Sequence, residues 1–283
     1  MIEETKSQSV LSYKETQKFR MGWSEVSALF VGYIVAQIIV GIIAMGLTMY
    51  FGKNILTSAW FMTIAYMVSM LFPIAAFYLL ILKPKKISFN FSLKNSNITI
   101  YILSFAMMFG MMLVSEFLVS KIPISGPFFG TLYESFSKQM EEISLSPMAM
   151  VVMTVILAPI LEEIVFRGII LKGMLNKGVN PKKAIFISAL VFGVIHGYPW
   201  QLVGAFFLGL VLGLVYEKTN SLLIPILLHA FNNGLASIFE TNFQVESFSQ
   251  LFHISEIILL AIGLVIIIIT AYFFNKKTSN STE

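Results

Sequence analysis

Four polar side chains lie in otherwise apolar stretches of the sequence, and their types suit hydrolysis of a peptide bond: Glu162, His196, His229 and Asn233. A carboxylate in a water-poor site is a stronger base and takes a proton from water. Imidazole and amide groups hold that water or donate hydrogen bonds to the oxyanion that forms. In this scheme Glu162 activates a water that His196 helps to hold. His229 and Asn233 then stabilise the oxyanion.

A second carboxylate and an arginine accompany Glu162 in the apolar stretch 148–171. Each charge near the centre of a membrane helix costs about 2.5–3.5 kcal/mol on translocon scales, so these groups need partners or water. Glu163 and Arg167 are four residues apart, so they share a helix face and form an ion pair. Glu162 is rotated by about 100° and has no such partner in its own helix. We interpret Glu163 and Arg167 as supporting residues, and a purely structural Glu–Arg clamp is the alternative.

The four candidate catalytic residues fall at similar depths in the membrane. Counted at about 1.5 Å per residue from the expected cytoplasmic ends of their helices, they lie roughly 10–20 Å deep. Three separate helices thus place polar groups in one layer, and a shared site explains this most simply. Pro159 is expected to free a backbone carbonyl and kink its helix. Pro225 either does the same or begins its helix.

A metal site is a second interpretation of the same side chains. Glu162, His196 and His229 form a two-His, one-Glu set of the kind that binds catalytic Zn²⁺. The sequence does not distinguish a zinc-bound water from a water activated by Glu162 alone, so zinc stays an open cofactor prediction. The HExxH and GxSxG motifs of other hydrolases are absent.

Composition indicates the kind of scaffold that must position these residues. Of the 283 residues, 57% are hydrophobic and only 12% are charged, against roughly 25% charged in soluble domains. A membrane helix needs about 20 apolar residues. The sequence therefore predicts an all-α, polytopic membrane helix bundle of about eight transmembrane helices. The expected spans are 24–50, 57–82, 98–120, 147–171, 184–198, 200–216, 222–240 and 256–274.

Basic residues predict the orientation of this bundle. With eight spans and a cytoplasmic N-terminus, sixteen of the 19 lysines and arginines fall inside and only Lys53, Lys121 and Lys138 fall outside. Both termini are therefore predicted to be cytoplasmic. The segment 121–146 is the longest external loop and is expected to hold an interfacial helix. No cleaved signal peptide is expected, because the first 22 residues lack an apolar run.

Several other features are assigned structural roles. Gly193 with Gly197, and Gly209 with Gly213, form GxxxG pairs expected to allow close helix packing. Three tryptophans (Trp23, Trp60 and Trp200) fall at span ends, where an amphipathic ring is favoured. The pair Glu141–Glu142 and the single His253 are expected to be external and solvated.

At these motifs the sequence resembles the CAAX prenyl protease 2 family, also called the CPBP or ABI family of CAAX proteases and bacteriocin-processing enzymes. EExxxR occurs at 162–167, FxxxH at 192–196 and HxxxN at 229–233, and the match covers about residues 147–236. The resemblance implies a wholly helical membrane fold and endopeptidase activity within the membrane. It implies an active site on Glu162, His196, His229 and Asn233, supported by Glu163 and Arg167. The family is usually labelled metallopeptidase, and a metal-free glutamate mechanism competes with that label.

These observations lead to one hypothesis and two alternatives. We predict an intramembrane endopeptidase whose partners are a peptide or protein substrate and the lipid bilayer, without nucleic acid. The resemblance suggests a CAAX-like sequence, a bacteriocin or a signal peptide as substrate. The alternatives are a membrane transporter and a non-catalytic bacteriocin-immunity protein. We divide the chain into a cytoplasmic tail (1–22), N-terminal helices with the external loop (23–146), catalytic helices (147–240), and a last helix with a cytoplasmic tail (241–283).

Overall fold

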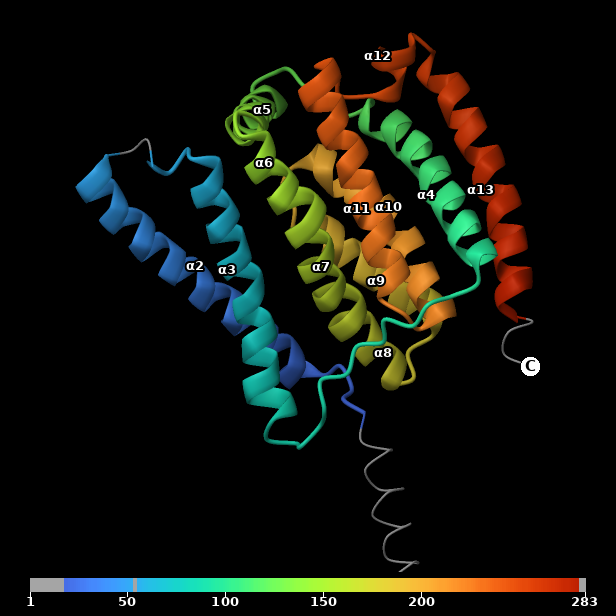
Figure 1. The fold of residues 1–283 in the computed structure, drawn as a ribbon, viewed down its shortest axis with the longest axis horizontal. Helices are drawn as coiled ribbons and strands as arrows, with labels where there is room; N and C mark the ends of the chain where they lie inside the picture. Colours follow the sequence, from blue (N-terminus) through green and yellow to red (C-terminus); the bar gives the residue numbers. More distant parts are fainter. Residues whose placement is uncertain (1–17, 53–54, 280–283) are drawn as a thin grey trace, which may run out of the picture.

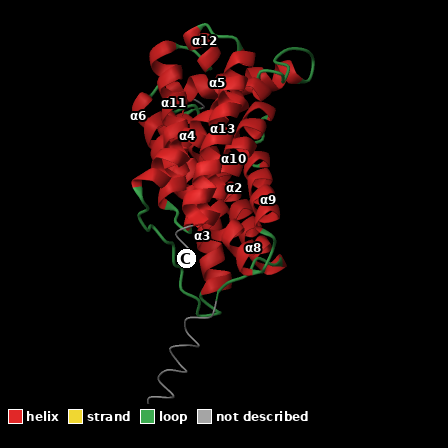
Figure 2. Cartoon of the chain, turned by 90° about the vertical axis from the view of Figure 1, so that its right-hand side faces the viewer, coloured by secondary structure: helices red, strands yellow, loops and turns green. Residues whose placement is uncertain are grey.

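The computed structural model describes residues 18–52 and 55–279, and within these ranges the chain consists of helices and connecting loops, without a strand (Figures 1 and 2). The predicted all-α class is therefore confirmed. Much of the predicted N-terminal tail and Lys53 lie outside the described residues. The elements are α2 (Trp23–Phe51), α3 (Ala59–Phe77), η2 (Tyr78–Leu82), α4 (Ile98–Val119), α5 (Phe129–Ser144), α6 (Pro147–Met150), η3 (Val151–Leu157), α7 (Ala158–Glu163), η4 (Ile164–Leu171), α8 (Lys172–Asn176), α9 (Pro181–Val194), α10 (Pro199–Thr219), α11 (Leu223–Ile238), η5 (Phe239–Phe243), α12 (Phe248–Phe252) and α13 (Glu256–Ser279), where η marks π-helical segments.

Six helical segments in the described part of the chain are long and apolar enough to cross a membrane, rather than the expected eight. The two other expected spans coincide with α9, of 14 residues, and α11, of 16 residues. At about 1.5 Å per residue both are shorter than a ~30 Å hydrocarbon core. The sixth expected span is longer than anticipated, because α10 has 21 residues. The six segments are Trp23–Phe51, Ala59–Leu82, Ile98–Val119, Pro147–Asn176, Pro199–Thr219 and Glu256–Ser279.

The helices form two groups (Figure 1). The α2–α3 hairpin stands at one side: α2 packs on α3 and η2, and α3 reaches α5, α6, η3 and α7. In the other group α10 packs on α4, α9, α11 and η4, α11 also packs on η3 and α7, and α13 packs on α4. Small residues set the spacing in both groups, since a Cβ on Gly32 of α2 would lie 2.7 Å from the Pro73 Cα, and one on Gly263 of α13 would lie 2.6 Å from the Gly110 carbonyl oxygen.

The α9–α10 pair packs through glycines, as predicted for three of the four GxxxG residues. A Cβ on Gly193 would lie 2.7 Å from the Leu202 carbonyl oxygen, and Cβ atoms on Gly209 and Gly213 would approach Ala189 and Ile185 at 3.2 and 3.0 Å. The prediction for Gly197 is wrong. It lies beyond the end of α9 with φ +79°, and a Cβ added there would have nothing within 4 Å, so this glycine turns the chain toward α10.

The segment Pro147–Asn176 is one continuous rod in which π-helical turns flank the short α-helix α7. The Ala158 amide donates to the Met153 carbonyl, a π-type bond, and Pro159 follows with no N–H to donate. The helix break expected at Pro159 therefore takes the form of a π-helical segment. Pro225 lies in the first turn of α11, so it begins its helix.

Two features at the ends of the bundle differ from expectation. Phe19 and Met21, in the predicted polar tail, are buried, and the Met21 amide donates to the Gly173 carbonyl at 2.9 Å. Trp200 is only 6% exposed and packs against Tyr133 of α5 at 5.1 Å between ring centroids, so it is a core residue rather than a membrane-surface anchor.

The expected helix in the loop 121–146 is present as α5. Glu141 and His253 are exposed, as predicted.

Candidate active site

The site is built on α7, where two consecutive carboxylates both point into protein. Glu162 is 8% exposed and Glu163 is fully buried, although a 100° rotation separates neighbouring residues on a helix. They are covered from different directions, because Glu162 meets α3 while Glu163 meets η4 and α11. Glu163 is held by Arg167, as the sequence predicts, whereas the hydrogen bond from Tyr66 to Glu162 was not foreseen.

Glu163 links a buried arginine to a buried histidine. Arg167 Nη1 donates to Glu163 Oε1 at 2.8 Å, which confirms the predicted ion pair, and Nη2 donates to the Gly209 carbonyl at 3.1 Å. His229 Nδ1 lies 3.0 Å from the same Oε1. A carboxylate paired with arginine accepts, so Nδ1 carries the hydrogen. This fixes the tautomer of His229 and leaves Nε2 without a hydrogen, as an acceptor.

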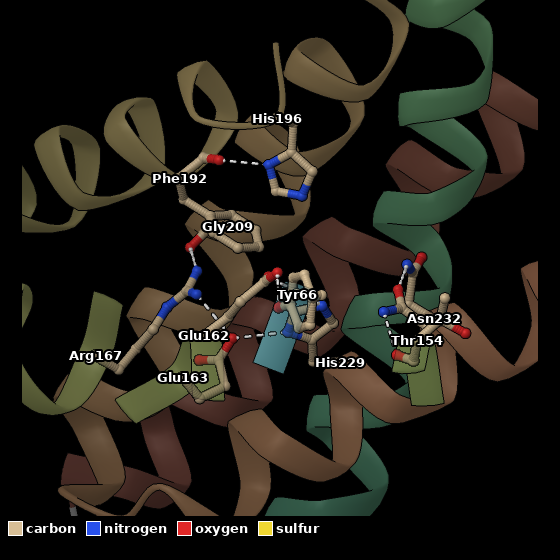
Figure 3. Close-up of polar contacts among 11 residues, drawn as sticks. Tyr66, Thr154, Glu162, Glu163, Arg167, Phe192, His196, Gly209, His229 and Asn232 are labelled. Carbon is tan, nitrogen blue, oxygen red and sulfur yellow. Dashed lines mark hydrogen bonds and ion pairs between the residues drawn. The ribbon is translucent and has the colours of Figure 1, made fainter. Parts of the chain in front are cut away.

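Glu162 has one oxygen held and one oxygen free (Figure 3). Tyr66 Oη of α3 donates to Oε1 at 2.6 Å. Oε2 is buried without a hydrogen-bond partner among the described residues, and it lies 3.8 Å from His229 Nε2. Oε2 of Glu163 also lacks a partner, but its Oε1 already accepts two charge-assisted bonds. The free oxygen of Glu162 and the free nitrogen of His229 therefore face each other across a gap that a water at about 2.8 Å from each would bridge.

His196 lies just beyond the end of α9 and is half-buried. Its Nδ1 donates to the Phe192 carbonyl at 2.7 Å, which leaves Nε2 free. Within the described chain no hydrogen bond or ion pair joins it to Glu162 or His229. The Phe192 ring contacts both imidazole rings edge to face, with ring centroids 5.0 Å apart for His196 and 5.7 Å apart for His229.

Asn233 lies one turn beyond His229 on α11, and its side chain is held at both ends. Its Nδ2 donates to the Thr154 carbonyl at 2.7 Å, and its Oδ1 accepts from Asn232 Nδ2 at 2.9 Å. The Thr154 carbonyl is accessible because the Ala158 amide bonds to Met153 and Pro159 has no N–H. Because the register is π-helical here, the carbonyl left to Asn233 lies five residues before Pro159, rather than one α-helical turn before it as expected.

The candidate zinc ligands do not form an assembled set in the described part of the chain. No group of three or more histidine, aspartate and glutamate side chains in the described ranges is placed to hold one, and the chain has no cysteine. Zinc on Glu162, His196 and His229 therefore stays a prediction.

Sequence reasoning missed three contributors: Tyr66, Thr154 and Asn232. Tyr66 is one of ten tyrosines, and nothing in its neighbourhood distinguishes it. Thr154 contributes a backbone carbonyl, which only the proline five residues later could have indicated. Asn232 stands beside Asn233 as a second amide in an apolar run, and this is the signal that could have identified it.

The similarity to known proteins lies in the part of the chain that contains the candidate active site. The family described as type II CAAX prenyl endopeptidase Rce1-like matches residues 144–235, which contain the candidate catalytic and supporting residues. This segment belongs to the Rce1-like family. The resemblance noted at the three motifs is therefore confirmed.

Three curated relatives match the Rce1-like segment. The membrane-embedded CAAX protease MroQ of Staphylococcus aureus is 31% identical over 91 residues, which are 30% of this chain and 36% of that protein. The UPF0177 proteins YxdF and YaiF of Lactococcus lactis are 28% and 34% identical, over 32% and 30% of this chain and 51% and 37% of their own. The chain thus spans about half or less of the relatives it matches. No solved structure matches it. The long apolar helices and the membrane-embedded relative together identify a multi-pass integral membrane protein.

Proposed function

We propose that this protein is an intramembrane endopeptidase that hydrolyses a peptide bond with a water activated by Glu162. One observation carries the proposal: the buried, unpartnered Oε2 of Glu162 lies 3.8 Å from His229 Nε2. Glu163, held by Arg167, orients His229 as a carboxylate orients histidine in other hydrolases. The relative named a CAAX protease supports the reaction class.

The reaction follows from the hydrogen bonds of the site. The water donates one hydrogen to Glu162 Oε2 and the other to His229 Nε2, so its lone pair faces the scissile carbonyl carbon. As the new C–O bond forms, Glu162 takes the first proton. The oxyanion accepts a hydrogen bond from the second Nδ2 hydrogen of Asn233. The C–N bond then breaks, and Glu162 returns its proton to the leaving amine.

This scheme changes one predicted role. His229 was expected to donate to the oxyanion. Because its Nδ1 hydrogen is directed at Glu163, the neutral ring offers Nε2 as an acceptor for water. Asn233 remains as the oxyanion donor, and His196 Nε2 remains as a second acceptor at the rim of the site.

The proposal includes eight membrane crossings with both termini in the cytoplasm. The two short crossings are α9 and α11, whose polar groups face other helices. Support comes from the alternation of basic loops and from Figure 1, where α8, the start of α4 and the end of α13 lie at one end of the bundle and α5 and α12 at the other. A peptide with a C-terminal CAAX sequence is the proposed substrate class, on the strength of the Rce1-like match.

Cleavage by purified protein in liposomes tests the proposal. The substrate is a quenched fluorescent peptide with a C-terminal CAAX sequence, offered with and without a farnesyl group. Glu162→Gln keeps the side-chain shape but removes the base, and we expect cleavage to fall about 100- to 10,000-fold. The matched control is Glu141→Gln, an exposed carboxylate on α5, for which we expect no more than a twofold change. Equal cleavage by Glu162→Gln and wild type would overturn the proposal.

Two additional arms separate the alternatives. A chelator followed by Zn²⁺ tests the cofactor prediction, since loss and recovery of cleavage would assign the water to a metal. An imposed membrane potential tests a transporter, whose activity would follow the potential and survive Asn233→Ala. If the protein is a non-catalytic immunity protein, the Glu162→Gln variant should still protect cells that express it.

A further inference from the structure

Asn232 is a half-buried amide on the apolar helix α11, at one of the unspecified positions of the HxxxN motif. Its Nδ2 donates to Asn233 Oδ1 at 2.9 Å. Placing an amide in an apolar environment is unfavourable unless it makes a hydrogen bond. The bond to Asn233 therefore accounts for the presence of this side chain.

The acceptors around Asn233 fix which way its amide points. The Thr154 carbonyl only accepts hydrogen bonds, so the atom 2.7 Å from it must be Nδ2. Oδ1 then faces Asn232, and an amide oxygen only accepts, so Asn232 must present its NH₂ group. Each of these two bonds excludes the flipped orientation of the Asn233 amide, so both assign the same orientation.

One hydrogen of Asn233 remains after this accounting. Nδ2 carries two hydrogens, of which one goes to the Thr154 carbonyl, while Oδ1 is already engaged. The amide thus offers a ligand an N–H group, which attracts negative charge. Without Asn232, the Thr154 carbonyl alone would hold the amide, and its remaining N–H would no longer be fixed toward the substrate.

We propose that Asn232 is a positioning residue: together with the Thr154 carbonyl that Pro159 leaves accessible, it holds the Asn233 amide with an N–H directed at the substrate. The proposal deepens the peptidase function and rests on it. Asn232 touches no reacting atom and acts through Asn233.

Asn232→Asp tests the proposal most sharply. Aspartate keeps the shape and size of the side chain but replaces the donor by an acceptor, which repels Asn233 Oδ1. Losing an oxyanion donor outright costs about 100- to 1,000-fold in kcat. We expect Asn232→Asp to lower kcat by about tenfold or more, with KM within about twofold. The matched control is Thr241→Val, about two helical turns beyond Asn233. It removes a hydroxyl that donates to the Ser237 carbonyl, and it should retain wild-type kcat.

A double-mutant cycle separates positioning from packing. In an Asn233→Ala background, Asn232→Asp should cause no further loss, because there is no amide left to orient. A purely structural role would lower kcat in both backgrounds equally, and that result would overturn the proposal. If wild type cleaves and Asn232→Asp cleaves equally well, this inference fails while the proposed function stands.

A measurement independent of catalysis completes the test. In protein labelled with ¹⁵N-asparagine, the side-chain NH₂ signal that disappears in Asn233→Asp belongs to Asn233. We expect this signal to shift and its hydrogen exchange to accelerate in Asn232→Asp, and to stay in place in Thr241→Val. An unchanged signal in Asn232→Asp would overturn the proposal even if no substrate were cleaved.

Discussion

Tyr66 reaches the candidate base from another helix, and its hydrogen bond to Glu162 Oε1 is the shortest in the site at 2.6 Å. A carboxylate with one oxygen bound has one orientation, whereas a free carboxylate rotates about its last bond. By holding Oε1, Tyr66 leaves Oε2 turned toward His229. In the proposed mechanism the Tyr66 hydroxyl therefore selects which Glu162 oxygen acts as the base.

We expect Tyr66→Phe to lower kcat by about three- to tenfold with little change in KM, since the hydroxyl orients the base and a net hydrogen bond to a charged group contributes about 1.5–3 kcal/mol at most. Steady-state cleavage of the quenched peptide measures both constants. Tyr101→Phe is the matched control, because it removes an exposed hydroxyl that bonds to Asn95 at 2.7 Å. A rise in KM alone would show that Tyr66 contacts substrate rather than orienting Glu162.

Contacts four residues apart on one helix could be predicted from the sequence, and contacts between helices could not. The Glu163–Arg167 pair follows from a spacing of four residues. The bonds Tyr66–Glu162 and Asn233–Thr154 depend on how far each helix is rotated about its axis. That rotation is set by packing in three dimensions, which hydrophobicity around a membrane helix indicates only weakly.

At the scale of elements, the α9–α10 contact determines where His196 lies, since His196 follows α9 directly. The bounds of the long helices were predictable within about five residues, because a run of apolar residues marks a membrane helix. Two of the eight expected spans, however, coincide with the shorter helices α9 and α11. The π-helical register of η3 was not, since it arises where backbone bonds are shifted by one residue. Pro159 was its single sign in the sequence.

We expect Gly193→Ala to destabilise the protein by about 1–3 kcal/mol, because the added Cβ would lie 2.7 Å from the Leu202 carbonyl oxygen and push α9 from α10. Unfolding by SDS in mixed micelles measures the difference. Gly204→Ala on α10 is the matched control, since its Cβ would meet only Ser115 Oγ, at an ordinary 3.6 Å. Equal stability of the two variants would show that α9 and α10 separate without cost.

At the scale of the whole molecule, the eight-crossing arrangement distributes the exposed loops between two sides. The absence of cysteine makes this measurable with single introduced cysteines. Ser88 and Lys218 lie on the proposed cytoplasmic side and Ser125 on the proposed outer side, and all three are exposed. Tyr198, between α9 and α10, is half-buried and is also proposed to lie on the outer side.

We expect a membrane-impermeant maleimide to label Ser125→Cys and Tyr198→Cys in intact cells, and Ser88→Cys and Lys218→Cys only after permeabilisation. The reverse pattern would contradict the orientation. Labelling of Tyr198→Cys and Lys218→Cys from the same side would contradict the crossing by α10.

The partners of the buried charges are far apart along the chain, and this affects how the protein is made. Arg167 bonds to the carbonyl of residue 209, and Glu163 to His229, 66 positions later. At a synthesis rate of about 5–20 residues per second, that separation lasts about 3–13 s. Throughout that interval the fourth long helix carries incompletely satisfied charges, so it must wait beside the translocon or another protein surface rather than in lipid. Its release into the bilayer is therefore tied to the arrival of the last third of the polypeptide.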